Sequence, residues 1–360
     1  MAKILYSLSG EGWGHSSRSK IVLEHLLFHK NHEVKVVTSG KGYEYLRDEF
    51  DVEKIMGFQF AFKGGEVDVG NTIKENIVRL LKEGSETVKF LVKLVDEFKP
   101  DLVISDYEPF LAMVSATKDI PLISVNHVNI IANGKLDYPK SWERERLLAL
   151  AVCKMMNVSV EYYLIPSFFF PELKEEFKAN TTLVPPVLRN EVVSKTSSKG
   201  DYVLVYVTTE ETKDILLPLL EKIETNFIAY GFGQGNSTYN NIVFKEPSTE
   251  DFLEDLAGSD VVITNTGFNV ISEALFFYKP VYTIPIHNQF EQMVNGYYLE
   301  KLGYGLSDLA PSIERINSFL AGSSEYRVNI VKNKNNFSGN EQFFRLLDSR
   351  IDTIANKISV

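Results

Sequence analysis

Short apolar runs alternate with longer amphipathic stretches along the chain. The first apolar run, residues 3–8, is rich in strand-forming residues and ends in a glycine-bearing turn. Residues 16–30 then carry apolar side chains at helical spacing, and residues 33–38 form the next apolar run. A strand, a turn, a helix and a second strand in this order are typical of a doubly wound sheet with parallel strands.

The same alternation starts again after a polar interruption. Residues 194–200 show no apolar periodicity, and a new strand-turn-helix series begins at residue 202. We therefore expect an α/β protein with two Rossmann-like domains whose parallel sheets face each other across a cleft. The predicted parts are an N-terminal domain over 1–188, a linker over 189–200, a C-terminal domain over 201–337, and a last helix within 338–360 that packs back on the N-terminal domain.

The composition excludes several classes of protein. With 44% hydrophobic and 24% charged residues the chain is an ordinary globular protein, and its one cysteine, Cys153, excludes an internal disulfide. No cluster of His, Cys and Asp has the spacing of metal ligands, so we expect no metal. The net charge of −10 argues against nucleic-acid binding. No apolar run reaches the about 18–20 residues of a membrane-spanning helix, and no signal peptide is evident, which predicts a cytoplasmic protein.

A histidine and an aspartate are candidates for acid–base chemistry. His15 follows the first glycine turn, at the N-terminal end of the predicted helix. The helix dipole disfavours imidazolium there, which suits His15 to act as a base; the alternative is a loop histidine that caps the helix. Asp106 comes directly after the buried strand 102–105, so in a parallel sheet it lies at the same edge as His15. There it either orients the imidazole or caps the following turn.

A candidate ligand site follows the buried strand 260–264. Gly267 lies between this strand and a helix, where it lets a ligand approach the backbone, and the first helical turn suits a diphosphate. Glu273, farther along the same helix, is placed to bind ribose hydroxyls. The alternative is that Gly267 serves only as a helix-entry turn and Glu273 as a solvated charge. Downstream, a run of amides offers donors and acceptors for sugar hydroxyls: Asn288, Gln289 and Gln292.

These motifs resemble those of GT-B glycosyltransferases. The resemblance rests on Gly12-Trp13-Gly14-His15 after the first strand and on the segment 260–275, which contains Gly267 and Glu273. Among these enzymes the chain is most similar to family 28, which includes the bacterial N-acetylglucosaminyltransferase that makes lipid II, and to a group of uncharacterised archaeal and bacterial transferases. The resemblance spans nearly the whole chain.

The resemblance implies that the C-terminal domain binds a nucleotide-sugar donor, a UDP-sugar, which is a substrate; it implies no cofactor. The diphosphate would lie against the turn at Gly267, the ribose against Glu273, and the sugar against the downstream amides. The backbone of residues 244–248 would contact the base. The implied donor-binding residues are Thr208, Thr209, Phe244, Ser248, Thr266, Gly267, Phe268, Asn269, Glu273, Asn288, Gln289 and Gln292.

The resemblance also implies that the N-terminal domain binds the acceptor, which would be a glycan, a lipid-linked molecule or a small molecule. His15 would deprotonate the acceptor hydroxyl and Asp106 would support it, in one displacement that inverts the anomeric centre without a metal. Arg18 would meet an acidic or lipid-phosphate acceptor, or pair with Glu11. A lipid-linked acceptor would require only peripheral docking at the inner face of the membrane. The implied acceptor-binding residues are Gly12, Trp13, Gly14 and Arg18.

Two other functions are compatible with the sequence. A UDP-sugar 2-epimerase shares this fold, but it uses a set of carboxylates and basic side chains that we do not see in this chain. A non-catalytic nucleotide-sugar-binding protein would keep the segment from Gly267 to Glu273 and would have no need of His15. The presence of His15 therefore favours the glycosyltransferase.

Overall fold

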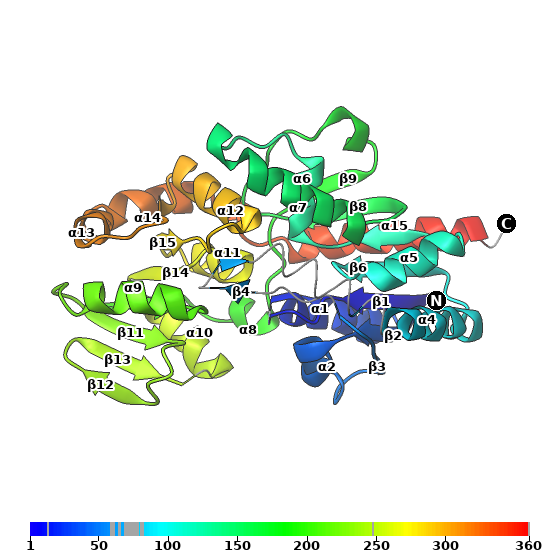
Figure 1. Ribbon diagram of the computed structural model, residues 1–360, viewed down its shortest axis with the longest axis horizontal. Coiled ribbons are helices and arrows are strands. Elements are labelled where there is room, and N and C mark those ends of the chain that lie inside the picture. The colour runs from blue at the N-terminus through cyan, green and yellow to red at the C-terminus, as the bar shows by residue number, and fades with distance from the viewer. Residues whose placement is uncertain are drawn as a thin grey trace. The chain divides into compact units, whose positions relative to one another are not determined.

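The computed structural model describes residues 1–12, 14–57, 62–63, 66–67, 79, 83–246 and 248–358, and Trp13 lies outside these ranges. The chain divides into two compact units (Figure 1). The first comprises Met1–Ala61, Asp68–Arg189 and Gly339–Val360, and the second comprises Phe62–Val67 and Asn190–Ser338. Each unit is built on a parallel sheet, so the predicted α/β class is confirmed.

The first unit has the strand order β3-β2-β1-β6-β7-β8-β9, and its strands pair in parallel. β1 pairs with β2 on one side and with β6 on the other, so the strand order reverses beside β1, where doubly wound sheets bind ligands. The strands are β1 (Lys3–Leu8), β2 (Glu33–Thr38), β3 (Val52–Lys54), β6 (Leu102–Asp106), β7 (Leu122–Ser124), β8 (Val160–Pro166) and β9 (Thr181–Val184).

Both faces of this sheet are buried. Because successive side chains of a strand point to opposite faces, Ile4 and Tyr6 of β1 enter one hydrophobic core and Leu5 enters another. Helices cover the two faces. They are α1 (Gly14–Glu24), which continues as a π-helical turn (His25–His29), α2 (Gly40–Leu46), α4 (Ser85–Phe98), α5 (Pro109–Thr117), α6 (Ile130–Asn133), α7 (Glu143–Met156) and α15 (Asn340–Ile358). Short 3₁₀ turns stand at His127–Asn129, Lys140–Trp142 and Glu175–Phe177.

The C-terminal helix α15 belongs to the first unit, although the second unit precedes it in the chain. Its apolar face carries Phe343, Leu347, Ile351 and Ile354, which lie in the same core as Ile4. Figure 1 shows α15 running past β6 and β8, and it contacts both strands. The helix therefore forms part of the wall of the first unit's core.

The second unit repeats this architecture, with the order β12-β13-β11-β10-β14-β15-β16. The pairs are parallel apart from β12, which runs antiparallel to β13. The strands are β10 (Tyr202–Tyr206), β11 (Asn226–Tyr230), β12 (Ser237–Tyr239), β13 (Ile242–Lys245), β14 (Val261–Asn265), β15 (Val281–Ile284) and β16 (Gly305–Ser307). The helices are α8 (Asn190–Val193), α9 (Glu210–Leu220), α10 (Thr249–Gly258), α11 (Phe268–Phe276), α12 (Phe290–Lys301), α13 (Ile313–Ala321) and α14 (Ser323–Lys332), with a 3₁₀ turn at Lys334–Asn336. A short antiparallel pair, β4 (Phe62–Lys63) and β5 (Glu66–Val67), is grouped with this unit.

We expected residues 189–200 to form a linker between the domains. In the structure, residues 190–200 belong to the second unit. The backbone N–H of Ser198 donates to the carbonyl of Ala257 at 2.9 Å, and that of Gly200 donates to Gly258 at 2.7 Å. The buried ammonium of Lys279 also donates to the carbonyl of Ser198. These hydrogen bonds attach the polar segment to the second unit, and its lack of apolar periodicity gave no sign of them.

Candidate active site

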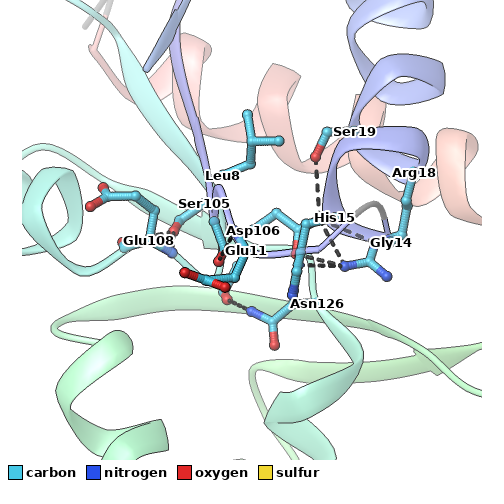
Figure 2. Close-up of polar contacts among 12 residues, drawn as sticks. Leu8, Glu11, Gly14, His15, Arg18, Ser19, Ser105, Asp106, Glu108 and Asn126 are labelled. Atoms are coloured by element: carbon cyan, nitrogen blue, oxygen red, sulfur yellow. Dashed lines mark hydrogen bonds and ion pairs between the residues drawn. The ribbon is translucent and has the colours of Figure 1, made fainter. Parts of the chain in front are cut away.

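The first candidate site lies where β1 and β6 end side by side. Leu8, the last residue of β1, is paired in the parallel register with Asp106, the last residue of β6. The chain leaves β1, turns and enters α1 at Gly14, which places His15 in the first helical turn. His15 Nδ1 lies 2.9 Å from Asp106 Oδ1, so the structure brings the two predicted residues into hydrogen-bond contact (Figure 2).

Asp106 is fully buried and accepts hydrogen bonds on both carboxylate oxygens. Arg18 Nη2 lies 2.6 Å from Oδ1 and 2.8 Å from Oδ2, and its Nε lies 3.2 Å from Oδ2. Ser19 Oγ donates to Oδ2 at 3.2 Å. Figure 2 shows His15, Arg18 and Ser19 converging on this carboxylate. Burial by itself opposes ionisation, but Arg18 and His15 outweigh it, and the pKa of Asp106 is lowered from its ordinary value.

The position of Arg18 differs from the expectation that it meets the acceptor or pairs with Glu11. Its side chain is only 5% exposed, and its guanidinium is occupied by Asp106. The physical reason is that a buried carboxylate requires a counter-charge, and a guanidinium one turn along α1 from His15 supplies it in bidentate geometry.

His15 is the more accessible member of the pair, with 21% of its side chain exposed. The Asp106 carboxylate faces Nδ1, which assigns the proton to Nδ1 and the lone pair to Nε2. The ring of Tyr107 lies parallel to the imidazole, with centroids 6.0 Å apart. Tyr107 has φ of 64°, in the left-handed region that side-chain-bearing residues rarely adopt. Such strain is often retained at functional sites, and here it shapes the turn that follows Asp106.

Backbone packing and backbone conformation explain two of the glycines that precede His15. A Cβ at Gly10 would lie 2.1 Å from the carbonyl oxygen of Ser39, so the close approach of two backbones requires glycine there. Gly12 has φ of +69°, and among the described residues a Cβ on it would meet no heavy atom within 4 Å. Its conformation alone therefore favours glycine. Gly14 is the first residue of α1. Trp13, the remaining residue of this predicted acceptor-binding group, lies outside the described residues.

In the second unit, Asn265 organises the predicted diphosphate turn. Its Oδ1 accepts hydrogen bonds from the backbone N–H of Thr208 at 2.8 Å and from the Thr208 hydroxyl at 3.1 Å. Its Nδ2 donates to the Thr212 hydroxyl at 3.0 Å and to the carbonyl of Ile284 at 3.1 Å. The sequence pattern did not mark Asn265 as a site residue. The available signal was a polar amide at the end of a largely apolar central strand, where an unpaired amide is costly.

Gly267 precedes α11, and no contact with the described part of the chain requires a glycine there. Its φ is −71°, and a Cβ placed on it would meet no heavy atom of those residues within 4 Å. It makes no side-chain capping hydrogen bond, as expected of a glycine N-cap. Beside it, the hydroxyl of Thr266 is buried and has no hydrogen-bond partner within the described ranges. An open approach to the start of a helix is the geometry that suits an anion.

Glu273 and Tyr206 lie near each other in this part of the second unit. Glu273 is 6% exposed on α11. Tyr206 ends β10, and burial together with the Glu273 carboxylate raises the pKa of its hydroxyl. Glu273 is therefore a buried side chain, which excludes the alternative of a solvated surface charge.

Several other predicted donor residues are used by the fold itself. Thr209 and Ser248 cap α9 and α10 by accepting hydrogen bonds from Thr212 N–H and Asp251 N–H. The Phe244 side chain is buried in the core, so only its backbone can contact a ligand. The side-chain carbonyl of Gln292 accepts from the backbone N–H of Ile286 at 2.9 Å.

The remaining predicted residues lie at the starts of two helices. Phe268 and Asn269 are the first two residues of α11. Asn288 has φ of 63°, and Gln289 is the N-cap residue of α12, where its side chain makes no capping hydrogen bond. The structure thus places Thr208, Gly267 and Asn269 at the carboxyl edge of the second sheet, with the amides of 288–292 following β15.

Within the described ranges, no group of three or more His, Cys, Asp and Glu side chains is arranged to hold a metal ion. In that same part of the chain, no helix combines the length and apolarity needed to cross a bilayer.

Comparison with known proteins identifies the family. The model of the family described as glycosyl transferase family 1 matches residues 2–322. The chain belongs to this family. An uncharacterised glycosyltransferase from Methanosarcina acetivorans is 26% identical to this family 1 glycosyltransferase over 334 residues, which cover 84% of the chain and 82% of the relative.

Solved structures share the fold of this family 1 glycosyltransferase. MurG from Acinetobacter baumannii has a TM-score of 0.62 at 12% identity, covering 97% of this chain and all of MurG. The spinosyn rhamnosyltransferase SpnG complexed with thymidine diphosphate has a TM-score of 0.60 at 12% identity, with the same coverage. These similarities confirm the predicted GT-B fold. The matching family is family 1, whereas the sequence motifs resemble family 28.

Proposed function

We propose that this protein is an inverting glycosyltransferase that transfers a sugar from a UDP-sugar to an acceptor hydroxyl. The observation that carries the proposal is the contact between His15 Nδ1 and the buried carboxylate of Asp106. This contact leaves the lone pair on Nε2, which is the atom that accepts a proton in a His–Asp pair.

The proposed reaction is a single displacement. His15 Nε2 takes the proton of the acceptor hydroxyl, and the acceptor oxygen attacks the anomeric carbon of the donor sugar. The bond from that carbon to the UDP oxygen breaks as the new bond forms, so UDP leaves with the electron pair and the configuration inverts. Asp106 stabilises the imidazolium that results, and no metal or cofactor takes part.

The donor is proposed to bind in the second unit. The diphosphate would lie at Thr266, Gly267, Phe268 and Asn269, where the start of α11 stabilises negative charge on the leaving group. Support comes from the open space at Gly267 and from the nucleoside diphosphate bound to SpnG, which has the same fold. Glu273 would hold the ribose. Asn288, Gln289 and Gln292 would face the sugar.

The acceptor is proposed to bind in the first unit near His15, in a family 28-like arrangement. This assignment is supported by the resemblance of the motifs and by the fold shared with MurG. Gly12, Trp13 and Gly14 remain the proposed acceptor contacts. Arg18 no longer belongs to that group, because its guanidinium is occupied by Asp106. Peripheral association with a membrane is part of the proposal only if the acceptor is a lipid.

The donor half is tested by calorimetric titration with UDP, TDP, GDP and ADP. Selective binding of UDP supports a UDP-sugar donor, and selective binding of another nucleotide would contradict it. The catalytic step is tested by UDP release from a panel of UDP-sugars mixed with glycan, lipid-linked and small-molecule acceptors. His15→Ala is compared with His29→Ala, a surface histidine of the same unit. Loss of a general base lowers kcat by about 10²–10⁴-fold. Equal turnover by both variants would refute the role of His15, and interconversion of UDP-sugars without UDP release would indicate an epimerase.

A further inference from the structure

Arg18 contacts both members of the His15–Asp106 pair. Besides its bonds to the carboxylate, its Nη2 lies 3.3 Å from His15 Nδ1. We propose that Arg18 is a positioning residue, whose guanidinium fixes the Asp106 carboxylate and thereby fixes which nitrogen of His15 carries the proton. The inference deepens the proposed function and rests on it, since it concerns how the same pair is prepared for catalysis.

The geometry leaves the carboxylate one arrangement. Oδ2 accepts from Arg18 Nε, from Arg18 Nη2 and from the Ser19 hydroxyl, which in turn accepts from the buried Tyr6 hydroxyl at 3.0 Å. Oδ1 accepts from Arg18 Nη2 and faces His15 Nδ1. Because Oδ2 is filled, Oδ1 is the oxygen presented to the imidazole. Rotation of the carboxylate would break the bidentate contact, so the fork of Arg18 holds Oδ1 in place.

The charge of Arg18 has a second effect. A guanidinium keeps its protons at all ordinary pH values, so it acts only as a donor and cannot accept the Nδ1 proton. Its positive charge also offsets the negative charge of the Asp106 carboxylate that faces the imidazole. The Nδ1 proton of His15 therefore has Oδ1 as its acceptor, on a carboxylate that is already paired with a cation. Glu11, which interacts electrostatically with His15, and the Tyr107 ring also face the imidazole.

The experiment reads His15 directly and needs no substrate. The full-length protein is labelled with ¹⁵N-histidine, and the resonances of His15 among the six histidines are assigned with His15→Gln. Two-bond ¹H–¹⁵N spectra recorded over a pH series give the tautomer and the titration midpoint. The parent is compared with Arg18→Met, which removes the charge, and with Ser19→Ala, which removes one hydrogen bond to the same carboxylate but no charge.

The parent is expected to show the Nδ1–H tautomer. In Arg18→Met the midpoint should rise by about one pH unit or more, or the tautomer should change, since the counter-charge of Asp106 is gone. Ser19→Ala should resemble the parent. If Arg18→Met fails to fold, Arg18→Gln, which keeps a donor without the charge, carries the same expectation.

The inference is overturned if the charge-removing variant keeps both the tautomer and the midpoint of the parent. This result is independent of the proposed function, because it involves neither donor nor acceptor. A histidine held as proposed in a protein that releases no UDP would refute the transferase function and leave the positioning by Arg18 intact.

Discussion

Replacing Gly267 by alanine separates a requirement of the ligand from a requirement of the fold. Glycine usually occurs where its conformation or a close contact demands it, and neither applies at this position. Its φ is −71°, and the added methyl group would meet no heavy atom within 4 Å among the residues that the structure describes. If a donor diphosphate approaches the start of α11, however, the methyl group stands in its path.

The two effects have different sizes. Alanine restricts the unfolded chain, which stabilises the folded protein by about 0.4–1 kcal/mol. Alanine is also a poorer N-cap residue than glycine, which acts in the opposite direction. The stability of Gly267→Ala should therefore stay within about 1 kcal/mol of the parent. Forcing a methyl group into a filled contact costs about 1–3 kcal/mol. That cost corresponds to a weakening of nucleotide binding by about 5- to 150-fold.

Urea denaturation measures the stability, and calorimetric titration with UDP measures the affinity. Gly322→Ala is a matched control, because Gly322 has φ of −86° and its added Cβ would make only ordinary contacts of 3.4 Å or more. The control should leave the UDP affinity unchanged and keep the stability within about 1 kcal/mol of the parent. Gly267→Ala with parental stability and parental UDP affinity would refute the placement of the diphosphate at this turn.

Three further predictions concern the first unit. Burial raises the pKa of Glu108 from its ordinary 4.5 to about 7, despite two backbone N–H groups of α5 that donate to its carboxylate. Between pH 4.5 and 7 the folded protein keeps a proton on Glu108 that the unfolded chain loses, so the free energy of unfolding falls by about 3 kcal/mol over this range. Urea denaturation at pH 5 and pH 8 should show this fall in the parent and a smaller one in Glu108→Gln. Leu347→Ala removes a fully buried side chain of α15 and should lower the stability by about 2–5 kcal/mol; an unchanged thermal midpoint would contradict the packing of that helix. Asp106→Asn should lower kcat by about 10⁴-fold. It should also lower the stability by about 3–5 kcal/mol, because it leaves Arg18 buried without a counter-charge. The double variant Arg18→Met/Asp106→Asn should recover the stability but not the turnover.

The sequence predicted the parts of the molecule that follow from periodicity. Alternating apolar runs predicted two parallel sheets, and a parallel sheet brings the ends of its strands to one edge. For that reason the proximity of His15 and Asp106 could be expected before the structure was known. Gly267, between a buried strand and a helix, could be located by the same reasoning.

Side-chain partners could not be predicted in this way. An arginine three residues after a histidine can face solvent or the interior, and only the complete burial of Asp106 shows why Arg18 turns inward. Gln292 resembles a sugar-binding amide, yet its carbonyl is occupied by Ile286. Asn265 ends a strand in sequence, and the two segments to which its side chain bonds, at Thr208–Thr212 and at Ile284, are distant from it along the chain. Long-range contacts of this kind depend on tertiary packing, which local patterns do not encode.

The return of α15 to the first unit has a consequence for the order in which the protein folds during synthesis. The first unit contains residues from both ends of the chain, and the stretch Asn190–Ser338 lies between them. The ribosome therefore completes the second unit's segments before it releases residues 340–358. Until then Ile4 and its neighbours lack the side chains of Phe343, Leu347, Ile351 and Ile354. The core of the first unit therefore stays incomplete until α15 has been synthesised. During that time its exposed apolar surface is available for chaperones to bind.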